Sequence, residues 1–276
     1  MKNNQTTKLK ILAALIAVGL TNALFAQDAA TDAKAAAAEL AKKLQNPIAS
    51  LISVPIQNNF DFGAGPTGDG FQYKVNVQPV IPISLNENWN AVSRTIIPFV
   101  YQEKIFGNSS QSGLSDTVQS VFLSPKDPTQ HGWIWGAGPV FMLPTATETL
   151  LGAGKWGTGP TAVLLKQENG WTYGALANHI WSFAGSSSRP AVNATFLQPF
   201  VSYTTKTFTT LTLNSESTYD WSSSQWTVPV NALVSQLLKV GKQPIQLSLG
   251  GRYYAEKAAN GPDWGLRFAI TFLFPK

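Results

Sequence analysis

Apolar and polar residues alternate along most of the chain from residue 49 to the C-terminal end. The clearest example is the last segment, where one face carries Trp264, Leu266, Phe268, Ile270, Phe272 and Phe274, and the other carries Gly265, Arg267, Ala269 and Thr271. Because successive side chains of a β-strand point to opposite faces, this period of two predicts strands with one apolar and one polar face. A soluble β-sandwich would show the same alternation, so the pattern alone does not identify a membrane protein.

Segments of this type recur about twelve times along the chain, separated by turn-forming residues. We expect strands near residues 49–61, 71–84, 89–102, 115–125, 133–144, 157–167, 171–184, 192–204, 207–219, 225–239, 244–255 and 264–274. The connections alternate between mostly short ones, at 86–88, 168–170, 205–206 and 241–243, and mostly longer polar ones, at 62–70, 103–114, 145–156, 185–191 and 256–263; the connections 126–132 and 220–224 depart from this contrast. Short turns at one rim and long loops at the other are typical of outer-membrane barrels.

The nine tryptophans test this interpretation independently. They lie at or near the ends of the expected strands, at positions Trp89, Trp133, Trp135, Trp156, Trp171, Trp181, Trp221, Trp226 and Trp264. Indole has an apolar body and one N–H donor, so it prefers the boundary between hydrocarbon and water. The sequence therefore predicts an all-β fold: a closed, up-and-down, antiparallel transmembrane β-barrel of about 12 strands. Closure also removes the unpaired strand edges that lipid cannot satisfy.

The N-terminal residues are typical of a secretory signal peptide. Lys2, Lys8 and Lys10 precede the apolar run 11–20, and small residues follow before the polar Gln27. Ten apolar residues are too few to span a hydrocarbon layer of about 30 Å. We expect cleavage after Ala26, with cleavage after residue 29 or 30 as alternatives, and therefore export from the cytoplasm.

One short helix is expected after the signal peptide. Residues 31–45 are rich in strong helix formers, Thr31 or Asp32 can cap the helix, and the Asn46-Pro47 pair ends it. The predicted organisation is a signal peptide at 1–26, a periplasmic helical segment at 27–48 and a transmembrane barrel at 49–276. The sequence leaves open whether the helix plugs the barrel or lies in the periplasm.

Charge and composition exclude several classes of protein. The chain has 20 basic and 15 acidic residues, and removing the three lysines of the signal peptide leaves a net charge of only +2. A basic excess confined to the leader gives no reason to expect a nucleic-acid partner. The absence of cysteine excludes disulfides, thiolate metal sites and a cysteine nucleophile.

No cofactor, metal or catalytic site is expected. The glycine patterns at 63–68 and 152–157 do not open a helix, so they have no helix N-terminus to hold a phosphate. Neither His131 nor His179 has a second ligand at metal spacing. His179 could act as the base of a lipid-modifying enzyme with Ser182, but it shares its face with Trp171, Tyr173, Trp181 and Phe183, which favours a structural role at the interface.

The candidate functional residues are charged positions within the strands. They are Lys74, Arg94, Glu216, Arg252 and Arg267, and each lies on a polar face. Facing a basic residue towards mid-bilayer lipid would cost roughly 2–4 kcal/mol, so we expect all five to point into the lumen, as pore-lining residues or as a salt-bridge network that fills the interior. About eight strands leave a packed interior and 16–18 an open channel, so twelve predict a narrow, partly plugged pathway with a weak preference for anions.

Several stretches also resemble a known bacterial family. They are 44–47 with 57–61, 93–98, 178–182, 196–200, and 252–254 with 262–268. They are similar to the bacterial outer-membrane transporter family related to the meta-pathway phenol-degradation outer-membrane proteins, whose members often carry the misleading label neuromedin U. The resemblance covers nearly all of the mature chain and implies a barrel with a transport role, but no defined substrate or catalytic residues. Many such barrels end on an aromatic residue that the assembly machinery recognises. Here Phe274 is followed by Pro275 and Lys276, so we expect the machinery to recognise Phe274 at an internal position.

Together these features predict a passive channel or transporter for small solutes in the outer membrane of a Gram-negative bacterium. The expected partners are outer-membrane lipid, the outer-membrane assembly machinery and a small-molecule solute. Two alternatives remain: a lipid-modifying enzyme built around His179, and a structural or surface-binding barrel that acts through its long loops.

Overall fold

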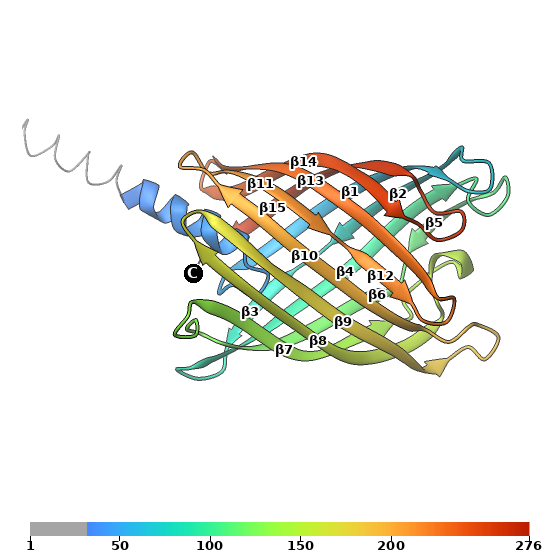
Figure 1. Cartoon of the computed structure of the whole chain (residues 1–276), viewed down its shortest axis with the longest axis horizontal. Coiled ribbons are helices and arrows are strands. Elements are labelled where there is room, and N and C mark those ends of the chain that lie inside the picture. The colour runs from blue at the N-terminus through green and yellow to red at the C-terminus, as the bar shows by residue number, and fades with distance from the viewer. Residues whose placement is uncertain (1–31, 276) are drawn as a thin grey trace, which may run out of the picture. The chain divides into compact units, whose positions relative to one another are not determined.

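The computed structural model describes residues 32–275, so the predicted signal peptide lies outside the described part of the chain. Residues 52–274 form a closed antiparallel barrel (Figure 1). Its strand segments are β1 (Ile52–Ala64), β2 (Gly70–Val77), β3 (Val80–Ser84), β4 (Trp89–Glu103), β5 (Ser110–Leu114), β6 (Thr117–Pro125), β7 (Trp133–Leu143), β8 (Lys155–Glu168), β9 (Trp171–Gly185), β10 (Asn193–Thr204), β11 (Thr209–Ser215), β12 (Ser217–Asp220), β13 (Gln225–Val240), β14 (Gln243–Glu256) and β15 (Trp264–Phe274).

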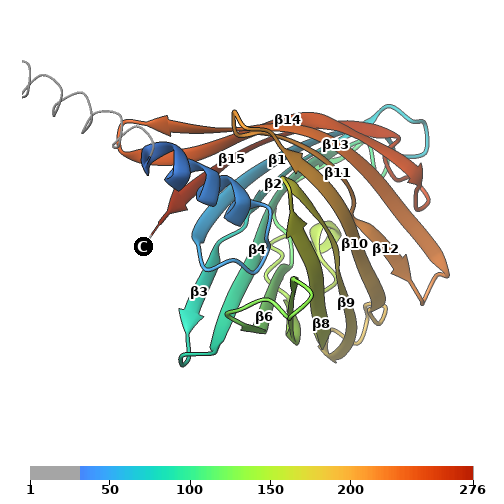
Figure 2. The ribbon, with the colours of Figure 1, turned by 60° about the vertical axis from the view of Figure 1, so that its left-hand side comes forward.

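These segments make twelve strands, as predicted. β2 and β3 pair with the same two neighbours, and so do β11 and β12, while β5 and β6 both pair with β4, so each couple is one strand with a local break. Consecutive strands pair antiparallel, and β15 returns to pair with β1 from Ile52 opposite Phe274 to Phe62 opposite Trp264. Figure 2 shows β1 lying between β15 and β2, which closes the sheet without a free edge.

The strand boundaries agree with the predicted ranges to within three residues except near residue 110; the largest of the small shifts is in β1, which was expected at 49–61 and covers 52–64. Residues 110–114 were expected in a loop, but they form β5 and pair with β4 from Phe99 to Glu103. This part of the prediction is wrong because Ser110–Leu114 is almost entirely polar and shows no apolar alternation. The loop at this corner is therefore shorter, covering only residues 104–109.

The outer surface of the barrel is apolar. Large side chains stand exposed along the strands, among them Leu213, Leu249, Leu266, Phe99 and Leu164. Aromatic residues pair near both rims: Trp89 with Trp135 and Trp171 with Tyr203 near the short turns, and Trp264 with Phe62 and Trp226 with Tyr219 near the long loops. This arrangement is the apolar band between two aromatic belts that outer-membrane barrels present to lipid.

The N-terminal helix covers residues 32–44 of the described chain, close to the predicted 31–45. No helix among the described residues is long and apolar enough to cross a membrane. A short 3-10 helix, η1 (Thr149–Leu151), lies in the loop between β7 and β8. Among the described residues these are the only two helical elements.

Candidate functional site in the barrel lumen

Three of the five predicted site residues meet in one ion cluster. The Arg267 guanidinium donates two parallel hydrogen bonds to Glu216, from Nη1 to Oε1 at 2.8 Å and from Nη2 to Oε2 at 2.7 Å. Arg252 Nη2 lies 3.8 Å from Glu216 Oε2. A bidentate arginine–carboxylate pair fixes both groups in geometry as well as charge, so the cluster is a rigid part of the interior.

The cluster lies on the inner face of the barrel. Glu216 lies between β11 and β12, and two further strands, β13 and β14, separate it from Arg267 on β15. Side chains that far apart around a closed sheet can touch only across its concave side. Glu216 and Arg267 therefore form a salt bridge on the inside of the sheet, and whether these charges line a solute pathway stays a prediction.

Sequence reasoning missed Asp61, which completes the cluster. Its Oδ2 accepts a hydrogen bond from Arg252 Nη1 at 3.3 Å, and the carboxyl group is 2% exposed. On the same strand, Asn59 Oδ1 accepts a hydrogen bond from Arg267 Nε at 2.7 Å. The signal was present, because Asn59 and Asp61 alternate with Phe60 and Phe62. The two carboxylates of the cluster thus balance its two arginines.

Lys74 and Arg94 lie apart from these pairs. Among the residues that the structure describes, neither forms an ion pair with a carboxylate. Arg94 Nη2 donates a hydrogen bond to Gln78 Oε1 at 3.3 Å, a neutral partner. Lys74 lies on β2 opposite Asn59, beside the ion cluster. The charges of Lys74 and Arg94 are therefore not neutralised by direct contact with a carboxylate among the described residues.

The opposite wall of the lumen is apolar. Phe122 of β6, Val163 and Leu165 of β8 and Leu176 of β9 are at most 3% exposed and form one cluster. The ion cluster, in contrast, is formed by residues of β1, β14 and β15 and by Glu216 between β11 and β12. The interior therefore has a charged side and an apolar side.

Residues 41–51 contribute to the inside of the barrel at the rim with the short turns. Ile48 belongs to the apolar cluster, and its side chain fills the space above Gly136, where an added Cβ would lie 3.1 Å from Ile48 Cδ1. The Gln167 side chain donates a hydrogen bond to the Lys42 carbonyl at 2.9 Å, and Asn90 donates one to Ser50 Oγ at 3.0 Å. This segment narrows the lumen from within.

The loop 144–154 folds against the inner face at the opposite rim. A Cβ added to the inward-facing Gly113 would lie 2.1 Å from Thr147 Oγ1 and 3.5 Å from Leu151 Cδ1. Asp116 holds the loop by accepting hydrogen bonds from the backbone N–H of Ala146 at 3.3 Å and of Ala153 at 2.6 Å. Both ends of the lumen are therefore partly covered by chain segments.

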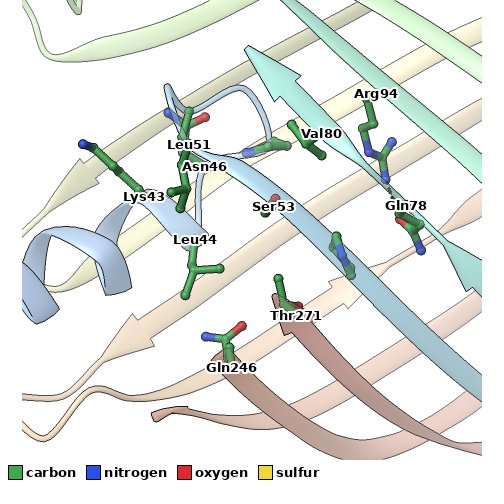
Figure 3. Close-up of a pocket in the computed structure, with 13 residues that line it drawn as sticks. Lys43, Leu44, Asn46, Leu51, Ser53, Gln78, Val80, Arg94, Gln246 and Thr271 are labelled. Carbon is green, nitrogen blue, oxygen red and sulfur yellow. Dashed lines mark hydrogen bonds between the residues drawn. The ribbon is translucent and has the colours of Figure 1, made fainter. Parts of the chain in front are cut away.

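A cavity of about 170 Å³ lies beside residues 43–51 (Figure 3). Polar groups reach it from four strands or their ends: Gln78 and Arg94 from one side, and Gln246 and Thr271 from the other. Leu44, Leu51 and Val80 supply apolar surface. Of the five predicted site residues, only Arg94 lines this cavity.

His179 has the surroundings of a structural residue. Its Nδ1 lies 2.7 Å from Thr195 Oγ1, which also accepts a hydrogen bond from Trp221 Nε1 at 2.8 Å, and its ring packs 4.1 Å from that of Trp181. Ser182, three residues along the strand, faces the other side of the sheet and binds the Val192 N–H. No carboxylate orients the imidazole within the described contacts, so the base–nucleophile arrangement of a hydrolase is not assembled with Ser182. In the described part of the chain, no group of three or more metal-ligating side chains is found either.

Neither a protein-family model nor a curated protein sequence matches this chain. Among solved structures, an outer membrane channel from Pseudomonas putida F1 superposes with a TM-score of 0.64 at 15% identity, over 82% of this chain and 96% of that one. The β domain of the Bordetella autotransporter BrkA superposes with a TM-score of 0.46 at 10% identity, over 82% of this chain and 100% of that one. The first likeness shows a shared fold. The apolar outer band of this barrel is suited to contact with the hydrocarbon of a lipid bilayer.

Proposed function

We propose that the chain is a passive channel for small solutes, with a narrow lumen of mixed charge and a weak preference for anions. One observation carries this: Lys74 and Arg94 stand in the interior without a carboxylate partner, while the carboxylates of Asp61 and Glu216 are already bound to arginines. An interior that only had to be filled would have no need for two uncompensated cations, because such charges are costly away from water.

The proposed solutes are small because both ends of the lumen are partly covered by residues 41–51 and 144–154. The likeness to an outer membrane channel supports this function, as does the resemblance of the sequence to the outer-membrane transporter family. We propose that its partners are outer-membrane lipid, the assembly machinery and a small-molecule solute.

Conductance of the purified protein in planar lipid bilayers tests the proposal. We expect discrete channel openings, and a reversal potential in a salt gradient that indicates anion preference. The exchanges Lys74→Gln and Arg94→Gln should shift the reversal potential towards that of cations, because each removes a positive charge from the pathway. Lys242→Gln, in an exposed turn outside the barrel wall, is the control. Bilayers that stay silent, or a reversal potential that neither lumen variant changes, would contradict the proposal.

A further inference from the structure

The cavity of Figure 3 contains hydrogen-bond donors that have no acceptor. Gln246 is 8% exposed, and its Nε2 has no hydrogen-bond partner among the described residues. The Arg94 guanidinium has five N–H donors, of which one is bound to Gln78. Buried donors are almost always satisfied in folded proteins, so an unmet buried amide that lines a cavity indicates an acceptor that binds there.

The charge of the cavity indicates what kind of acceptor this is. None of the described residues that line it carries a carboxylate, whereas Arg94 is cationic. The planar guanidinium fits a carboxylate with two parallel hydrogen bonds. The hydroxyl groups of Ser53 and Thr271 add further polar positions along the lining.

The remaining lining and the volume limit the rest of the ligand. Leu44, Leu51 and Val80 form an apolar surface between the polar groups (Figure 3). The volume of about 170 Å³ is close to the roughly 150 Å³ of an engineered apolar cavity that accepts benzene. A compact apolar body no larger than about one six-membered ring therefore fits the cavity.

We propose that this cavity is a binding site for a small organic monocarboxylate with a compact apolar body. Arg94 binds the carboxylate, the apolar body lies against Leu44, Leu51 and Val80, and Gln246 donates a hydrogen bond to an oxygen of the same ligand. The proposal deepens the channel function and rests on it for its biological meaning, because a site inside the lumen is reached only by a solute that enters it. Its test does not depend on conduction.

Equilibrium dialysis of the mature protein in detergent with radiolabelled benzoate tests the site, with benzamide, acetate and inorganic phosphate as competitors. Benzamide has the shape of benzoate without its charge, and acetate and phosphate have charge without an apolar ring. We expect saturable binding of benzoate that none of the three competitors displaces at equal concentration. Equal competition by benzamide would overturn the role of Arg94, and equal competition by acetate or phosphate would reduce the site to a general anion site.

Two variants locate the binding. Arg94→Met should weaken benzoate binding about tenfold or more, the effect of losing a charge-assisted hydrogen bond, while Lys242→Met at the same rim should leave it unchanged. Should Arg94→Met fail to form a barrel, shown by identical gel migration of boiled and unboiled samples, Gln246→Leu provides the second test and should also weaken binding severalfold. Binding that both folded variants retain, or no saturable binding by the original protein, refutes the site. Benzoate binding without conductance would instead refute only the channel.

Discussion

At the scale of single residues, the charge pairs inside the lumen carry both stability and selectivity. The Glu216 carboxylate pairs with two arginines: its Oε2 lies 2.7 Å from Arg267 Nη2 and 3.8 Å from Arg252 Nη2. The Glu216 side chain is only 20% exposed. Removing one member of a buried ion group leaves its partners charged and desolvated, which costs more than the pair itself contributes. Glu216 is therefore the most sensitive position of the cluster.

We expect Glu216→Gln to lower the free energy of unfolding by about 3 kcal/mol, because two guanidinium groups lose their shared carboxylate. Urea unfolding of the protein in lipid vesicles, followed by tryptophan fluorescence, measures this. Glu87→Gln in an exposed turn is the control and should change the unfolding free energy by less than about 0.5 kcal/mol. Equal midpoints for the two variants would show that lumen water already compensates the arginines.

Some residues of the ion cluster could be predicted from the sequence, whereas Asp61 was not. The inward orientation of Arg252, Arg267 and Glu216 could be predicted, because a charged side chain within an alternating strand destabilises the barrel when it faces lipid. Asp61 was missed although it is the last residue of the predicted strand 49–61; the strand in fact continues to Ala64. Which cations keep a free charge could not be predicted, since partners such as Asp61 and Arg252, 191 positions apart, are set by the closed register.

At the scale of the elements, close approach between neighbouring strands makes particular glycines necessary. A Cβ added to Gly159 on β8 would lie 1.8 Å from the carbonyl oxygen of His179 on β9, a backbone atom that cannot move alone. Gly251 on β14 has no atom within 4 Å of the same position. The two glycines have opposite tolerances although both lie inside strands.

We expect Gly159→Ala to destabilise the barrel by about 1–3 kcal/mol, the usual cost of overpacking, while Gly251→Ala has little effect. The fraction of refolded protein with heat-modifiable gel mobility, measured over a urea series, compares the two variants directly. Similar midpoints would mean that β8 and β9 can separate at this point without losing their register.

The elements themselves follow from the sequence to a large extent. Alternation placed twelve strands, and the boundary that is furthest from its predicted position lies at Ser110–Leu114, which has no apolar face to detect. The break between β2 and β3 at Gln78-Pro79 lies inside one predicted strand, because the alternation of Phe71, Tyr73 and Val75 resumes at Ile81.

At the scale of the whole molecule, residues 41–51 are the part that periodicity could not place. The stretch Asn46–Leu51 is too short to show a period, and its position depends on distant partners such as Gln167 and Asn90. Ile48, 4% exposed within the apolar cluster, packs as a core residue does. We therefore predict that this segment stays in place while the channel conducts.

A cysteine-free chain makes this prediction simple to measure. Ser50→Cys and Asn90→Cys place two thiols where side-chain atoms now lie 3.0 Å apart, and a short thiol-specific reagent can join them without competing sites. We expect the joined double variant to conduct as well as the untreated one. A lower conductance after cross-linking, reversed by cleaving the linker, would show that the segment must leave the lumen for solutes to pass.

The position of the ion cluster also dictates an order of events during biogenesis. Arg267 and Arg252, near the end of the chain, find their partners Asn59 and Asp61 on the first strand, so the cluster straddles the seam where the sheet circularises. A half-made, open sheet would present these unpaired charges to hydrocarbon. Circularisation must therefore precede or accompany entry into the bilayer, and a nascent polypeptide truncated ahead of β14 should remain stranded outside it.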